Sequence, residues 1–119
     1  MKHIEDNLQI SCVKYFSFQY PKIAHLLHHS PNGGRRNVRE GARFKEMGTR
    51  AGFPDLVLLV PRGEYHGAFF ELKSPKGVLQ PSQKKYIQML EEQGYYVAVI
   101  RSIKDFVRET ELYLELKHL

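Results

Sequence analysis

Two carboxylates and one amine are spaced so that a single turn of the chain brings them together. Asp55 begins the apolar run Asp-Leu-Val-Leu-Leu-Val, and Glu71 and Lys73 end the run Ala-Phe-Phe-Glu-Leu-Lys. The segment between them, 61–67, has the Pro and Gly content of a turn, so the two runs predict a β-hairpin. With the turn centred near Glu64, Asp55 is expected level with Lys73 and close to Glu71.

Residues 71 and 73 are two apart in one strand, so they project from the same face. Carboxylates this close repel each other, and a folded protein tolerates the repulsion where a divalent cation neutralises them. Oxygen ligands suit Mg²⁺ or Mn²⁺, and Mg²⁺ commonly takes one or two protein carboxylates plus a substrate phosphate. Asp55 and Glu71 therefore predict a metal site, with a phosphodiester as the substrate.

Lys73 has more than one candidate role beside such a cation. Its ammonium can orient the attacking water or stabilise charge in the transition state. Alternatively, the neutral amine can act as the base. The sequence leaves these roles open. The competing interpretation of the whole set is an ordinary ion pair on a surface hairpin, which contributes about 0.2 to 1 kcal/mol.

Further helices and strands must surround the hairpin to hold these side chains. Apolar periodicity marks them, and capping residues, Pro and Gly mark their ends. We expect helices at 3–18, 38–47, 81–93 and from 102 onward, strands at 23–29, 55–60, 68–73 and 95–100, and a turn at 30–34. This order predicts an α/β fold with a mixed central sheet flanked by helices.

The chain is basic, with 18 Lys and Arg against 13 Asp and Glu and a formal net charge of +5. The excess of positive charge is greatest in residues 35–50, which contain six basic residues and two acidic ones. A nucleic-acid backbone is the partner that such a stretch predicts, and a solvated surface face is the alternative. The predicted contacts are Arg35, Arg36, Arg39, Arg43, Lys45 and Arg50.

The motif Gly-Phe-Pro-Asp-Leu at 52–56, followed by Glu-Leu-Lys at 71–73 and Gln83 at a helix start, resembles a known family. It is similar to the VRR-NUC branch of the PD-(D/E)XK nucleases, from Glu5 to about Ile100. The resemblance implies a restriction-endonuclease-like αβββαβ core. To this core the chain adds an insertion at 35–47 and an extra C-terminal helix.

The resemblance also implies roles for individual residues. Asp55, Glu71 and the backbone carbonyl of Leu72 would be metal ligands, and Lys73 the catalytic lysine. Two residues would join them from the flanking helices. Gln83 would help to hold the site or the scissile phosphate.

Glu5 is the second of these helical residues, and it matches the acidic residue that the family places near the metal. Stand-alone proteins that resemble the chain are small phage and bacterial proteins that act as homodimers on branched DNA such as Holliday junctions. The resemblance therefore implies a Mg²⁺- or Mn²⁺-dependent DNA endonuclease that is a homodimer, because two-fold symmetry supplies two matched cuts.

Two other functions remain open: a non-catalytic nucleic-acid-binding module of the same fold, and a flap nuclease or exonuclease that acts on DNA ends. A sequence-specific enzyme is disfavoured, because no part of the chain is left over for a separate reading domain. A zinc site at His25, His28 and His29 is also disfavoured, because adjacent residues of a strand point to opposite faces.

Length and composition predict a single domain over 1–119. The resemblance implies that it acts in the cytoplasm of a bacterial or phage-infected cell. The longest apolar run, 56–60, is far shorter than the roughly 20 residues of a membrane span, so no membrane partner is expected. Polar residues at 5–7 interrupt any signal peptide. Cys12 is the single cysteine and cannot form an internal disulfide, which favours a reducing compartment.

Overall fold

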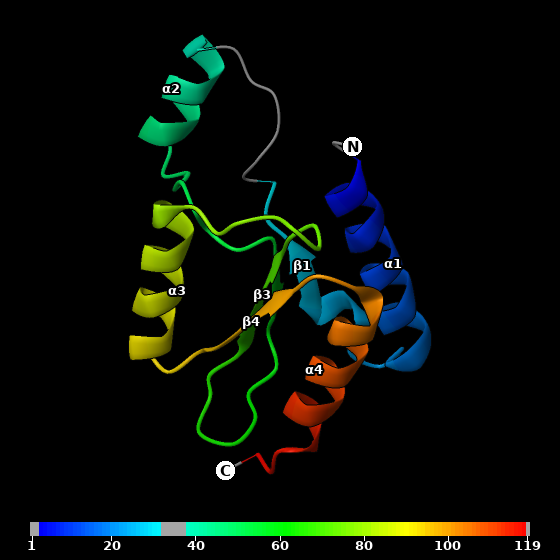
Figure 1. The fold of residues 1–119 in the computed structure, drawn as a ribbon. Helices are drawn as coiled ribbons and strands as arrows, with labels where there is room; N and C mark the ends of the chain where they lie inside the picture. The colour runs from blue at the N-terminus through cyan, green and yellow to red at the C-terminus, as the bar shows by residue number, and fades with distance from the viewer. Residues whose placement is uncertain (1–2, 32–37, 119) are drawn as a thin grey trace.

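The computed structural model describes residues 3–31 and 38–118 of the 119-residue chain. As predicted, it is an α/β protein in which a mixed sheet lies between helices (Figure 1). In the residues described, no helix is long and apolar enough to span a membrane. The elements in chain order are α1 (Ile4–Gln19), the 3₁₀ helix η1 (Ala24–Leu26), β1 (Leu27–His29), α2 (Val38–Glu46), β2 (Leu56–Leu58), β3 (Ala68–Leu72), α3 (Pro81–Glu92), β4 (Tyr96–Ile100) and α4 (Ile103–Glu115).

The hairpin strands β2 and β3 lie at the centre of the sheet. Over the described part of the chain, the strand order is β1-β2-β3-β4. β2 is antiparallel to both of its neighbours, whereas β3 and β4 are parallel, with Ala68 opposite Tyr96. Parallel neighbours require a crossover connection, and α3 supplies it. β3 therefore pairs with β4 over all five of its residues and with β2 over Ala68–Phe70.

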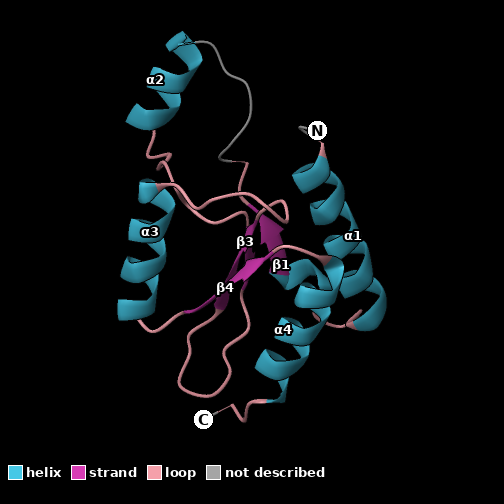
Figure 2. Cartoon of the chain, in the orientation of Figure 1, coloured by secondary structure: helices cyan, strands magenta, loops and turns pink. Residues whose placement is uncertain are grey.

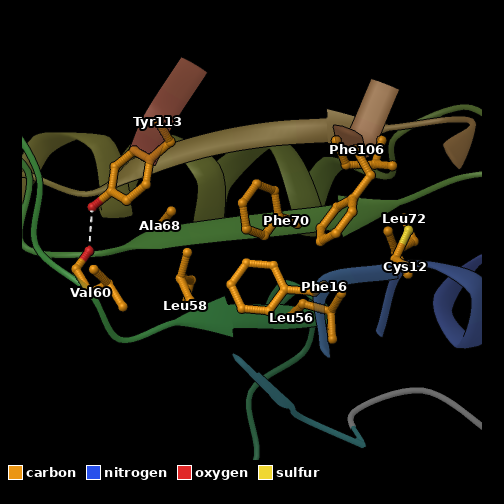
Figure 3. Close-up of a cluster of buried hydrophobic side chains, with 11 residues drawn as sticks. Cys12, Phe16, Leu56, Leu58, Val60, Ala68, Phe70, Leu72, Phe106 and Tyr113 are labelled. Atoms are coloured by element: carbon orange, nitrogen blue, oxygen red, sulfur yellow. Dashed lines mark hydrogen bonds between the residues drawn. The ribbon is translucent and has the colours of Figure 1, made fainter. Parts of the chain in front are cut away.

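Helices cover the sheet on both faces. α1 and α4 pack together on one face, and α3 lies on the other (Figure 2). Side chains alternate along β3, so Phe70 faces the buried cluster that includes Phe16 of α1 (Figure 3). Phe69 faces the opposite way, and its ring contacts Phe53. Glu71 shares the face of Phe69, so the alternation directs its carboxylate toward α3.

The predicted strand at 23–29 is wrong in its first half. Residues 24–26 form η1, in which the Leu26 amide donates to the Ile23 carbonyl, and only Leu27–His29 pair with β2. Apart from Ile23 the run has no β-branched residue, and Ala and Leu favour helical turns. The resulting strand is short and lies at the sheet edge.

The predicted hairpin is confirmed, but its register differs by two residues. Leu56 pairs with Phe70, which puts Asp55 level with Glu71 instead of Lys73. A shift of two preserves the alternation of side chains, so Glu71 and Lys73 remain on the face that the sequence predicts. The correction brings the two carboxylates closer together than expected.

The shift has two sources of one residue each: the turn is centred between residues 63 and 64 instead of on Glu64, and a bulge follows it. Arg62 and Tyr65 exchange backbone hydrogen bonds across a turn at Gly63, which has the positive φ of +54° that glycine tolerates. Between this tip and the paired strands, the three residues 59–61 lie opposite the two residues 66–67. The extra residue changes the pairing below the turn.

Candidate active site

Asp55 lies at the end of the sheet where β2 begins and β3 ends. It is half-buried, and its Oδ2 accepts a hydrogen bond of 2.8 Å from the backbone N–H of Leu72. Its own carbonyl accepts from the Ser30 N–H at 3.0 Å. These bonds attach Asp55 to both neighbouring segments and hold its carboxylate beside the last residues of β3.

Glu71 is more deeply buried than Asp55, with 3% of its surface exposed. Its Oε2 accepts a hydrogen bond of 3.1 Å from Nε2 of Gln83, in the first turn of α3. Its Oε1 is buried and, among the residues described, has no hydrogen-bond partner. A buried carboxylate oxygen that lacks a donor carries a desolvation cost, and a cation is one ligand that would offset this cost.

The two carboxyl groups shift each other's proton affinity. Burial, followed by the neighbouring Asp55, raises the pKa of Glu71 from its ordinary value of 4.5 to about 8. Burial also raises the pKa of Asp55, although the hydrogen bond from Leu72 opposes that rise. Without a cation, the pair therefore favours holding one shared proton near neutral pH.

Lys73 follows β3 on the same face as Glu71, and 9% of its surface is exposed. Its backbone N–H donates to the Ile100 carbonyl at 2.9 Å, which continues the pairing of β3 with β4. The positive charge of Lys73 partly offsets the rise in the Glu71 pKa, so the ammonium lies within electrostatic reach of the carboxylate. Two acids and one amine are thus brought together as the motif predicts.

Gln83 is held in one orientation by two hydrogen bonds. Its Oε1 accepts from the backbone N–H of Gln80 at 2.8 Å, which caps the start of α3. The amide nitrogen must therefore point the other way, toward Glu71. The side chain of Gln83 therefore both caps the start of α3 and holds the carboxylate of Glu71.

Glu5 approaches from the first turn of α1. Its Oε2 accepts a 3.2 Å hydrogen bond from the Ser74 N–H, and its charge raises the pKa of both Asp55 and Glu71. Over residues 3–31 and 38–118, no three His, Cys, Asp or Glu side chains are close enough together to hold a metal ion. The structure therefore brings Asp55 and Glu71 together but does not bring Glu5 into one cluster with them.

The donor set fits a hard divalent cation. Asp55 and Glu71 offer carboxylate oxygens, one of which is buried without a partner. Mg²⁺ and Mn²⁺ bind through few protein carboxylates and complete their coordination with water and phosphate. A Zn²⁺ centre of His or Cys ligands does not fit this set.

Comparison with known proteins adds independent information. The model of a family described as the VRR-NUC domain matches residues 5–104, a range that includes every residue of the site described above. The chain belongs to the VRR-NUC family. A solved structure described as a VRR-NUC domain protein is 33% identical to it, with a TM-score of 0.84 over 96% of this chain and 90% of that one. The comparison with curated proteins gives no match.

A VRR-NUC domain is a DNA-binding domain of nuclease type, which agrees with the carboxylates and lysine at the end of the sheet. Around this set, the domain has two polar residues that the sequence analysis missed. Nδ1 of His29 donates to the Asp55 carbonyl at 3.0 Å. Arg101 donates to the carbonyls of Ser74 and Gly77, at 2.9 and 2.6 Å, and so fixes the loop after Lys73.

These two residues are distant in sequence from the motif, and only the pairing of strands reveals them. β1 ends at His29, and its antiparallel pairing with β2 brings it beside Asp55. β4 ends one residue before Arg101, and its parallel pairing brings it beside the end of β3. A sequence search could have found them by asking which polar residues follow the neighbouring strands.

The basic residues predicted to contact nucleic acid fall into three groups. Arg35 and Arg36 lie outside the described residues. Arg39, Arg43 and Lys45 are exposed on α2, which extends away from the sheet beyond the start of α3 (Figure 1). Arg50 is exposed in the loop that leads from α2 toward β2. The four basic residues that the structure describes thus lie on the side of the domain at which Asp55 precedes β2.

The loop formed by the Gly-Phe-Pro-Asp-Leu motif at 52–56, called the motif loop below, contacts α3 backbone to backbone. Gly52 allows this close contact. Its φ is +85°, and a Cβ built on it would lie 2.4 Å from the Ser82 carbonyl oxygen and 2.9 Å from the Gln83 nitrogen. We predict that Gly52→Ala lowers stability by about 2 kcal/mol or more and reduces DNA cleavage, because Asp55 and Gln83 must move apart. Urea unfolding and a cleavage assay measure the two effects.

Gly41→Ala is the matched control, because a Cβ there meets no atom within 4 Å. It should not lower stability, because Ala is favoured over Gly inside a helix, and it should leave cleavage near that of the unmodified chain. Unchanged cleavage in Gly52→Ala would show that the close contact does not position the site.

The raised pKa of Glu71 predicts a stability change with a definite sign. Because the folded-state pKa of about 8 exceeds the ordinary 4.5, ionising Glu71 lowers folded-state stability as pH rises from about 4.5 to 8. In EDTA, Glu71→Gln should therefore be more stable than the unmodified chain at pH 8.5, by about 1 to 3 kcal/mol, and nearly equal at pH 4.5. Thermal melts at both pH values test this.

The cation supplies the second half of this experiment. Added Mn²⁺ should raise the melting temperature of the unmodified chain and have less effect on Glu71→Gln. A variant that is less stable than the unmodified chain at pH 8.5 in EDTA contradicts the assignment of Glu71 as a destabilising buried acid.

Proposed function

We propose that the protein is a Mg²⁺- or Mn²⁺-dependent endonuclease that hydrolyses DNA phosphodiesters. The observation that supports this most directly is the buried Oε1 of Glu71, which lies beside Asp55 and Lys73 and has no hydrogen-bond partner in the part of the chain that the structure describes. Family membership supplies the nuclease class. The cation and the catalysis are our inference from the donor set.

In this proposal Asp55, Glu71 and the Leu72 carbonyl would hold the cation. When bound, the cation would supply a Lewis acid for the phosphate oxygens and lower the pKa of a water molecule. The N–H of Leu72 donates to one oxygen of Asp55, and Gln83 donates to one oxygen of Glu71. These bonds hold the two carboxylates in place and leave the second oxygen of each as a candidate ligand.

Lys73 acts on the phosphate or on the attacking water. Its restricted exposure keeps the ammonium near the carboxylates rather than in bulk solvent, where it would contribute less. Glu5 acts from farther out by holding the Ser74 amide and so the loop after Lys73. Arg101 holds the same loop from the other side.

The basic residues of α2 and Arg50 grip the DNA backbone. Arg39 and Arg43 are four apart and so share a face of the helix, from which both can contact phosphates of one strand. Such contacts carry affinity without reading sequence. The proposed substrate is branched DNA such as a Holliday junction, cut by a homodimer whose two sites act on two strands.

The mechanism predicts a cleavage pattern. Labelled linear duplex, flap and four-way-junction DNA are each incubated with Mg²⁺, Mn²⁺ or EDTA, and products are resolved on a denaturing gel. We expect cleavage with either cation and none in EDTA, and a loss of about 100-fold or more in Asp55→Ala and Lys73→Ala. Lys117→Ala is the control, because this exposed lysine lies by the hairpin tip at the far end of the sheet.

The outcomes separate the parts of the proposal. Cleavage that survives EDTA, or that is equal in Lys73→Ala, overturns the mechanism. Cutting of flaps but not junctions overturns the junction substrate and leaves the nuclease in place. DNA binding without cleavage of any substrate favours a non-catalytic binding module.

The proposed grip predicts a change in salt dependence. Replacing Arg39 and Arg43 together by Ala should weaken DNA binding in EDTA and make the slope of log K against log salt less steep by about 2. Fluorescence anisotropy at several salt concentrations measures the slope. Arg108→Ala is the control, because Arg108 already pairs with Asp105 on α4. An unchanged slope in the double variant would show that α2 does not contact phosphates.

A further inference from the structure

A pocket of about 460 Å³ opens between α2, the loop after it and α3. Its walls are partly aromatic and partly polar. Phe44 of α2, Phe53 of the motif loop and Tyr86 of α3 supply the rings, and Ser30, Thr49 and Arg50 supply hydroxyls and a positive charge. Volumes of this size hold small planar ligands.

The rings are arranged so that a flat ligand can contact them. Phe53 and Tyr86 lie with centroids 5.2 Å apart at 72°, so one ring meets the other edge-on. The ring of Phe53 also contacts the ring of Phe69 of β3, with centroids 5.5 Å apart, and this contact helps to hold Phe53 in place. Phe44, Phe53 and Tyr86 all line the pocket, and each is half-buried.

The pocket lies next to the segment that carries Asp55. Phe53 precedes Asp55 by two residues, and the N–H of Ser30 donates to the Asp55 carbonyl. The exposed Arg50 lines the pocket. A ligand seated here thus contacts residues that are linked to Asp55, and it lies beside a basic side chain. A nucleotide, with a flat base linked to an anionic phosphate, has the matching chemistry.

We propose that this pocket receives one unpaired nucleobase of the DNA strand whose backbone lies at the acidic site. The inference rests on the proposed function and specifies how that site selects its substrate. A base inside a duplex is stacked and paired, so it cannot enter without being extruded at a cost of a few kcal/mol. Bases that are already unpaired, as in single strands, enter without that cost.

The test compares two oligonucleotides of equal length and charge in EDTA, where no cleavage occurs. One is labelled oligothymidine, and the other is the same backbone without bases. We expect the unmodified chain to bind the base-bearing strand about 10-fold more tightly, as expected for a base stacked on an aromatic ring. Fluorescence anisotropy gives both affinities.

Matched variants test whether the pocket causes the preference for the base-bearing strand. Tyr86→Phe keeps the ring and should keep the preference. Tyr86→Leu keeps an apolar side chain against Phe53 but removes the ring, and it should bind the two strands almost equally. Thr49→Leu narrows the pocket and leaves the contact between Phe53 and Tyr86 in place, so it should also lose the preference. Thermal melts verify that each variant is folded.

Equal affinities of the unmodified chain for the two strands, including undetectable binding of both, overturn the inference. A preference that persists in both Tyr86→Leu and Thr49→Leu overturns it as well. Because the binding assay needs no cleavage, its failure is distinct from failure of the proposed function. A preference in a protein that never cuts DNA supports the pocket and contradicts the nuclease.

Discussion

Burial of Glu71 beside a second carboxyl group is the constraint to which the rest of the site responds. Taken alone, this arrangement destabilises the fold, because two acids lose hydration and repel each other. The surrounding structure offsets only part of the cost. The backbone amide of Leu72 donates a hydrogen bond to one oxygen of Asp55, and the side-chain amide of Gln83 donates one to an oxygen of Glu71. Among the described residues, the remaining oxygen of Glu71, Oε1, has no hydrogen-bond partner.

Holding such a pair requires rigid supports on each side. β3 pairs with β4 along its whole length and with β2 over Ala68–Phe70, and the Leu72 N–H then bonds the Asp55 side chain, so the end of β3 is held beside Asp55. The backbone of Gly52 lies against the first turn of α3, which brings Gln83 close to the same point. The sheet, the motif loop and the helix therefore contact one another directly at this point. Packing of this kind keeps an unfavourable arrangement of charges in place.

The sequence predicted the central elements well because their signals are local. Pro81 and Gly94 bracket α3, and Gly48 follows α2 with a φ of +104°. Asp55, Glu71 and Lys73 were found because strand alternation and one turn suffice to bring them together. The errors arose where structure depends on distant contacts. The bulge between the turn and the strands changed which residue lies opposite Asp55.

The same reason explains the other differences. The segment at 23–29 has no strong strand propensity, and only its pairing with β2 makes its last residues a strand. His29 and Arg101 gain their positions from neighbouring strands rather than from any local pattern. The aromatic pocket joins residues of α2, the motif loop and α3, which no periodicity connects.

The attachment of the loop after Lys73 bears on how the protein is made. That loop is held by Glu5 at one side and by Arg101 at the other, and Lys73 itself bonds to Ile100. The partners are up to 69 residues apart in the chain, so loop closure must precede these contacts. A ribosome that has released the chain only through α3 has therefore delivered both acids and Lys73 together with Glu5 and Gln83, but not Ile100 or Arg101. The loop after Lys73 can gain its last contacts only when β4 and Arg101 have emerged, so its final arrangement forms late in synthesis.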